Sequence, residues 1–162
     1  MEDRPEQPHI DDESADLTTK EKLERQMQGF ISAINKRNFD PNSAAWSHAS
    51  PEFSGEVERP PGDSDLTPPG MMPLREHLAM FQFMAQMYPG FFISIFDLTT
   101  EIDEQTGMAT MFWNGETHGV PTGVVLPSVG ICDFKRYGRK WMCISFKGAR
   151  GMSDGIPDMP VP

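Results

Sequence analysis

Residues 124–149, VVLPSVGICDFKRYGRKWMCISFKGA, carry the pattern that decides the fold. Two β-rich runs, 124–137 and 140–149, flank the pair Gly138-Arg139. This pair suits a two-residue type II′ turn with glycine at its first central position. The pattern therefore predicts an antiparallel hairpin in which the numbers of paired residues sum to 277.

The regions before this hairpin extend the sheet and supply helices. Two more β-rich runs, 91–103 and 108–118, complete a four-strand meander. Further upstream the sequence predicts a helix, a short helix, a short strand, a loop and another helix, at residues 20–38, 41–49, 53–58, 59–73 and 74–88. Segregated helices and an antiparallel sheet define an α+β fold, and we expect the curved sheet and the helices to enclose an apolar pocket.

The first helix shows the clearest periodicity. Its apolar residues recur at i, i+4, i+7, i+8 and i+11, which is one face of an amphipathic helix: Leu23, Met27, Phe30, Ile31 and Ile34. The loop at 59–73 is too rich in proline and glycine for regular structure. A loop of this length is often a lid or a binding edge, although a plain surface connection fits equally well.

Composition limits the classes of protein. The chain has 162 residues, a single-domain length, with a formal net charge of −10 that repels nucleic acid and anionic membranes. Residues 1–16 hold seven acids against one arginine and read as a disordered leader, 17–150 as the folded domain and 151–162 as a flexible tail. No apolar run is long enough to span a membrane, and the N-terminus does not resemble a signal peptide. We therefore expect a cytoplasmic protein with reduced cysteines.

Asp133 is an acidic residue on an otherwise apolar face of the predicted hairpin. The register places it opposite Ile144, on a face with Val129, Ile131 and other apolar side chains. In a cavity, desolvation would raise the pKa of this carboxyl and suit it to general acid or base chemistry. The alternatives are a structural ion pair with an arginine, or a local bulge that turns the side chain to water.

Histidines and aromatic residues supply the other candidates. His118 ends the strand 108–118 and could relay a proton, or it could be a solvated turn residue. We expect the substrate to contact a set of residues that line the cavity: His48, His77, Phe81, Tyr88, Phe112, Trp113 and Ile144. No metal-ligand spacing and no nucleotide-binding motif is present, so we expect neither a metal nor another cofactor.

Residues 116–141, ETHGVPTGVVLPSVGICDFKRYGRKW, resemble the signature of the SnoaL-like polyketide cyclases of the nuclear transport factor 2-like superfamily. The matching elements are the segments 117–119 and 121–123, Asp133 with Arg136, and the turn at Gly138. The resemblance implies a cone-shaped fold and cofactor-independent catalysis, with Asp133 as the acid and base and His118 as its partner.

Two main functions follow from these observations. The first is a cofactor-independent cyclase, isomerase or dehydratase that acts on a hydrophobic polyketide or terpenoid intermediate. The second is a non-catalytic binding module for a small lipophilic ligand or a protein. A homodimer through the outer face of the sheet is expected under both, because that face looks too apolar to be left wet. A third, weaker option is a structural protein whose cone is filled by its own methionine and phenylalanine side chains.

Overall fold

The structure, a computed structural model, describes residues 17–58 and 71–150. The predicted leader 1–16, the tail 151–162 and most of the 59–73 loop lie outside the described residues. In chain order the elements are α2 (Thr19–Asn35), the short 3₁₀ helix η1 (Ala44–Trp46), β1 (Ala49–Glu58), α3 (Leu74–Met87), β2 (Phe92–Asp103), β3 (Met108–His118), β4 (Val125–Tyr137) and β5 (Lys140–Arg150). The predicted α+β class is confirmed.

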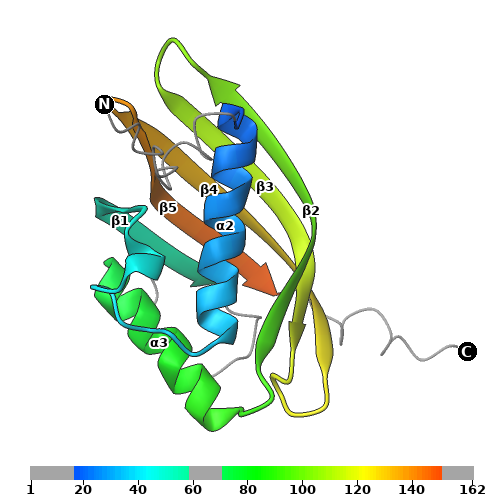
Figure 1. Cartoon of the computed structure of the whole chain (residues 1–162). Coiled ribbons are helices and arrows are strands. Elements are labelled where there is room, and N and C mark those ends of the chain that lie inside the picture. Colours follow the sequence, from blue (N-terminus) through cyan, green and yellow to red (C-terminus); the bar gives the residue numbers. More distant parts are fainter. Residues whose placement is uncertain (1–16, 59–70, 151–162) are drawn as a thin grey trace, which may run out of the picture.

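The five strands form one curved sheet in the order β1-β5-β4-β3-β2 (Figure 1). Strands β2 to β5 make the predicted antiparallel meander, and Gly138 has a φ of 65° as the tight turn between β4 and β5 requires. The prediction of a wholly antiparallel sheet is wrong at one edge, where β1 pairs with β5 in parallel. The long segment between β1 and β5 includes α3 and the strands β2 to β4, which allows β1 and β5 to run in the same direction.

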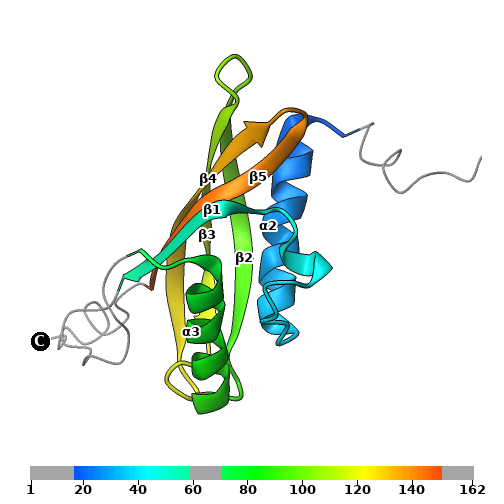
Figure 2. The same ribbon diagram turned by 90° about the vertical axis from the view of Figure 1, so that its left-hand side faces the viewer.

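Both helices lie over the same face of the sheet (Figures 1 and 2). The predicted stripe of α2 is buried there, and the Thr18 side chain caps the helix by accepting a hydrogen bond from the amide of Glu21 at 3.2 Å. At the other end, the Asn35 side chain makes two hydrogen bonds of 2.8 Å with the backbone of Ile93, one to its N–H and one to its carbonyl. These bonds fix the last turn of α2 to the edge strand β2.

The region between α2 and β1 differs from the prediction. The short helix expected at 41–49 is a single 3₁₀ turn, and the strand expected at 53–58 begins earlier, at Ala49. Trp46 anchors the turn, because its indole stacks on Phe30 with ring centroids 5.2 Å apart and donates a hydrogen bond to the carbonyl of Asn38. Within the part of the chain that the structure describes, neither helix has the length and apolar character needed to cross a membrane.

Candidate functional site

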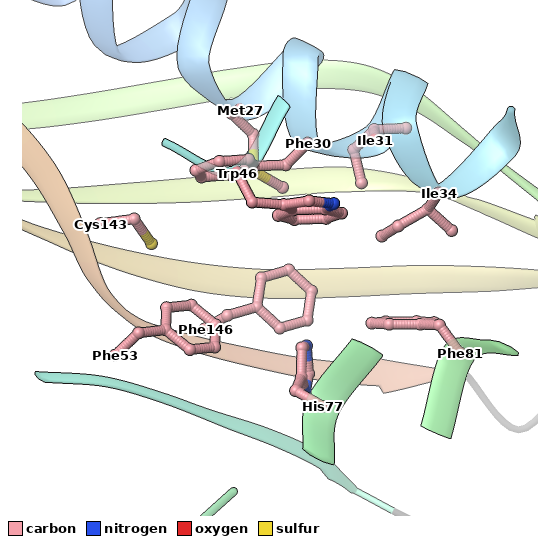
Figure 3. Close-up of a pocket in the computed structure, with 10 residues that line it drawn as sticks. All are labelled: Met27, Phe30, Ile31, Ile34, Trp46, Phe53, His77, Phe81, Cys143 and Phe146. Atoms are coloured by element: carbon pink, nitrogen blue, oxygen red, sulfur yellow. The ribbon is translucent and has the colours of Figure 1, made fainter. Parts of the chain in front are cut away.

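A small cavity of about 20 Å³ lies between the two helices and the sheet (Figure 3). The side chains around it are almost all apolar: Met27, Phe30, Ile31, Ile34, Trp46, Phe53, His77, Phe81, Cys143 and Phe146. Its volume is close to that needed for one water molecule. The expected interior space exists, but side chains fill most of it in this structure.

His77 points into this cavity from α3 (Figure 3). It is 3% exposed, and its Nδ1 atom has no hydrogen-bond partner among the described residues. Three aromatic rings surround the imidazole, with centroids at 5.6 Å for Phe53, 4.8 Å for Phe81 and 5.3 Å for Phe146. Burial in this setting lowers the pKa of His77 from 6.5 to about 4, so the imidazole is neutral at pH 7.

A glycine on β1 makes room for this imidazole. A Cβ atom at Gly55 would lie 2.4 Å from Nδ1 of His77, which no side chain tolerates. The backbone of Gly55 also exchanges two hydrogen bonds with Met72, at 2.7 and 2.8 Å. The segment that enters α3 is therefore fixed to β1, and His77 is held against the strand.

A second cavity, of about 40 Å³, lies further along the same interior. Phe81 and Phe146 line both cavities, while Thr117 and Ser128 bring polar groups to the second one. These two hydroxyl oxygens are buried and lie 2.6 Å apart, within hydrogen-bonding distance. The interior thus has the imidazole of His77 at one end, the hydroxyl pair of Thr117 and Ser128 at the other, and aromatic walls between them.

Trp113, one of the candidates for substrate contact, lines the second cavity. Its indole lies across the backbone of Gly130 on the next strand, where a Cβ atom would come within 2.2 Å of the ring. The ring of Phe146 stacks near it at a centroid distance of 6.0 Å. The indole of Trp113 therefore occupies the space above Gly130 on β4.

The predicted placement of Asp133 in the interior is wrong. Pairs of β4 and β5 sum to 277 only from the turn to Phe134 and Cys143, after which Asp133 pairs with Ser145 instead of Ile144. The shift marks a β-bulge that inserts Ile144 and reverses the alternation of β5 beyond it. The bulge lies on β5 and does not turn Asp133, which faces outward because the alternation of β4 is unbroken and its apolar alternate positions lie on the outer face.

Asp133 lies on the outer face of the sheet and is half-buried. Thr110 and Ser145 each donate a hydrogen bond of 2.8 Å to its carboxylate, one to each oxygen. Its neighbours on the same face of β4, Val129 and Ile131, are 51% and 38% exposed. The two hydroxyl donors satisfy the carboxylate of Asp133 on this apolar surface, so its position needs no interior cavity to explain it.

His118 lies on the outer face as well, far from Asp133. Its ring stacks on Phe92 at a centroid distance of 4.0 Å, and its Nε2 atom lies 3.5 Å from the hydroxyl of Ser94. Thr110, the cross-strand partner of Asp133, precedes His118 by eight positions on β3. At about 3.3 Å per residue this separation is about 26 Å, so the two side chains cannot act together on one atom of a substrate. Their individual catalytic roles stay predictions.

The remaining candidates are divided between the two faces. Phe112 is 41% exposed on the outer face, and Ile144 is the extra residue of the bulge, so neither lines the cavities. Tyr88 ends α3 and packs against the edge of the core. His48 is half-buried beside the core, where burial and the neighbouring Lys140 lower its pKa. The structure thus brings His77, Phe81 and Trp113 together in the interior and leaves the others outside it.

The described residues offer no group of three or more histidine, cysteine or acidic side chains that could hold a metal ion. Cys132 and Cys143 are both buried free thiols. Burial raises the pKa of Cys132 far above its ordinary value, so this thiol stays protonated and is a poor nucleophile. The chemistry of the interior therefore depends on His77 and on the hydroxyl pair.

No protein-family model and no curated protein sequence matches this chain. Solved structures do match it. The hexachlorocyclohexane dehydrochlorinase LinA-type3 from Novosphingobium barchaimii aligns over 83% of this chain and 87% of its own, with 11% identity and a TM-score of 0.65. An NTF2-like protein with a cystatin-like fold from Novosphingobium aromaticivorans aligns over 95% and 99%, with 11% identity and a TM-score of 0.60.

A protein from Streptomyces avermitilis, provisionally named a dehydratase of the NTF2-like family, aligns over 82% of this chain and 96% of its own, with 15% identity and a TM-score of 0.58. The chain therefore has the nuclear transport factor 2-like fold, as the resemblance in its sequence implied. Identities this low establish the fold alone. Membership of the SnoaL-like cyclases stays a prediction.

Proposed function

We propose that this protein binds a small, apolar molecule in the interior between the helices and the sheet, with His77 as a polar contact. The supporting observation is the buried imidazole whose Nδ1 atom has no partner among the described residues. A buried polar group without a hydrogen bond costs about 1–3 kcal/mol. A ligand that completes this bond recovers part of that cost.

Ligand entry requires the interior side chains to move, because the cavity next to His77 has a volume of about 20 Å³. Met27 has a flexible side chain in the wall of this cavity. The ring of Phe146 lies between this cavity and the second cavity. A cone filled permanently by its own side chains, the structural alternative, would not admit a ligand at all.

Calorimetric titration with 2-tetralone, an uncharged ketone whose carbonyl can accept a hydrogen bond from the imidazole, tests this proposal. We expect the wild-type protein to bind 2-tetralone, and the His77→Phe variant to bind it about 3- to 10-fold more weakly because one neutral hydrogen bond is lost. Glu76→Gln, at an exposed position on the same helix, is the matched control and should bind as the wild type does. Absence of binding to the wild-type protein at millimolar 2-tetralone would contradict the proposal.

A second candidate function is cofactor-independent acid–base catalysis, as in a cyclase, an isomerase or a dehydratase. His77 replaces Asp133 as the proposed proton-transfer group, because the neutral imidazole can accept a proton from a bound carbon acid. Structural similarity to proteins named a dehydrochlorinase and a dehydratase favours this class. The polyketide or terpenoid nature of the substrate remains part of this proposal.

Deuterium exchange into 2-tetralone, an uncharged ketone with an acidic C–H bond, tests the catalytic candidate. The imidazole removes a proton from the carbon beside the carbonyl, the enolate takes a deuteron from solvent, and the imidazolium returns its proton to solvent. We expect the wild-type protein to accelerate exchange and His77→Gln, which forms hydrogen bonds but accepts no proton, to lose the acceleration while 2-tetralone still binds. Equal rates for both proteins would leave binding as the function.

We also propose that the outer face of the sheet binds a second copy of this chain. Four consecutive outward positions of β4 are apolar and exposed: Val125, Pro127, Val129 and Ile131. Phe112 on β3 extends this surface and is paired with Ile131. Because β3 and β4 lie inside the sheet rather than at its edges, the apolar surface occupies the middle of the face.

Sedimentation velocity measures this association. We expect a dimer at micromolar concentration that Val129→Lys dissociates, because the substitution places a charge in an apolar interface. Gln86→Lys, at an exposed position on α3, is the control for the added charge and should stay dimeric. A wild-type monomer throughout the concentration range would contradict the dimer.

A further inference from the structure

The second cavity holds a polar feature that the proposed contact at His77 does not use. Thr117 on β3 and Ser128 on β4 are 5% and 3% exposed, and both lie on the inner face of the sheet. Their hydroxyl oxygens are 2.6 Å apart, a short hydrogen bond. The rest of the cavity wall is apolar apart from the indole N–H of Trp113.

One arrangement of hydrogen bonds engages both protons of this pair. Ser128 lies 3.4 Å from the carbonyl of Leu126, to which its hydroxyl can donate, and Thr117 then donates to Ser128. Each hydroxyl has one proton and two lone pairs, so this arrangement uses both protons and leaves acceptor sites on both oxygens. A ligand group that donates a hydrogen bond fits these acceptor sites.

Among the residues that the structure describes, the walls of the two cavities carry no ionised side chain. Neither lining set contains lysine, arginine, aspartate or glutamate, and His77 is neutral at pH 7. Burying an unpaired charge is far more costly than burying a neutral polar group. An anionic or cationic ligand would therefore find no partner in this interior.

Resting on the proposed ligand-binding function, we infer that the Thr117–Ser128 pair is a second polar anchor of the same site and that the ligand is uncharged and carries a hydroxyl group. Phe81 and Phe146 line both cavities and form the aromatic walls between them. Figure 3 shows these two rings beside His77. The hydroxyl of the ligand donates to Thr117 or Ser128, while its apolar body lies against the two rings.

Three probes of similar shape test this inference: p-cresol, toluene and p-toluate. Methyl NMR follows their binding, because Met27 lines only the first cavity and Met84 only the second. We expect p-cresol to shift the Met84 signal and to bind about 3- to 10-fold more tightly than toluene, and we expect p-toluate not to bind.

The double variant Thr117→Val/Ser128→Ala removes both hydroxyls together, which leaves no unpaired group and should preserve folding. We expect it to lose the preference for p-cresol over toluene and to keep the affinity for toluene. The matched control, Thr110→Val/Ser145→Ala, removes the hydroxyl pair on the outer face of the sheet and should keep the preference.

The outcomes separate this inference from the function on which it rests. Binding of p-toluate as tight as that of p-cresol, or a preference for p-cresol that survives the inner double variant, overturns the hydroxyl anchor while ligand binding stands. If none of the three probes shifts the signals of Met27 or Met84, both the anchor and the proposed function fail.

Discussion

Replacing His77 with phenylalanine should make this protein more stable at pH 7. The imidazole is buried among three aromatic rings, and its Nδ1 atom has no partner among the described residues. Removing such a group gains about 1–3 kcal/mol, and the larger phenyl ring offsets part of this gain by crowding Gly55. We expect a net stabilisation of about 1 kcal/mol.

The same substitution should change how stability depends on pH. The pKa of His77 is about 4 in the folded protein, against 6.5 for an unperturbed histidine. Between these values the unfolded chain binds a proton that the folded protein does not, so the wild type loses stability as the pH falls from about 6.5 to 4. A difference of about 2.5 units corresponds to about 3 kcal/mol. The variant lacks this contribution, so its advantage should grow from about 1 to about 4 kcal/mol.

Urea unfolding of both proteins at several pH values between 4 and 8 measures this difference. Subtracting the two curves removes the contributions of carboxylates and of His48, which both proteins share. Parallel curves would refute the reasoning, because they would mean that the imidazole is protonated or hydrogen-bonded in the folded protein. A variant less stable than the wild type at every pH would show that the three aromatic rings and Gly55 around His77 leave room only for the smaller imidazole ring.

Three further predictions concern packing and the outer face. Gly55→Ala should cost about 1–3 kcal/mol in urea unfolding, and much less in a His77→Ala background; equal costs in both backgrounds would exclude the close approach between these residues. Asn35→Leu should cost about 2 kcal/mol and speed hydrogen exchange at the amide of Ile93, because it removes both bonds between α2 and β2; an unchanged exchange rate would show that these bonds contribute little. Asp133→Asn should leave p-cresol binding unchanged, since this side chain lies on the outer face. A loss of binding in calorimetry would mean that Asp133 contributes to the ligand site.

Much of the architecture could be predicted because local patterns determine it. The stripe of α2 matches the residues that are buried, and the turn at Gly138 gave the correct pairing of β4 with β5 as far as Phe134. The parallel pairing of β1 was missed, because a strand carries no local mark of the distant partner beside which it will lie.

The site was harder to predict, for two physical reasons. The outward positions of β4 are as apolar as a core face, so alternation alone could not tell which side the helices cover. On the inner side, Gly130 is small because the Trp113 ring lies above it, and Ser128 lines a cavity; a search for apolar residues overlooks both. His77 was named as a candidate, but Gly55, the glycine that admits it, carried no visible signal in the sequence.

The bulge at Ile144 decides which side chains of β5 enter the interior. A strand has only two sides, so a one-residue shift in its pairing exchanges everything that follows between the inside and the outside. Here the bulge turns Phe146 inward, where it meets His77, and sends its neighbour Ser145 outward to Asp133. Regular pairing of Ile144 with Asp133 would instead present a hydroxyl to the interior and an aromatic ring to the surroundings. Deleting Ile144 would remove the bulge and leave both side chains on their present sides. The same stretch of sequence can therefore give two different linings, and the bulge alone selects between them.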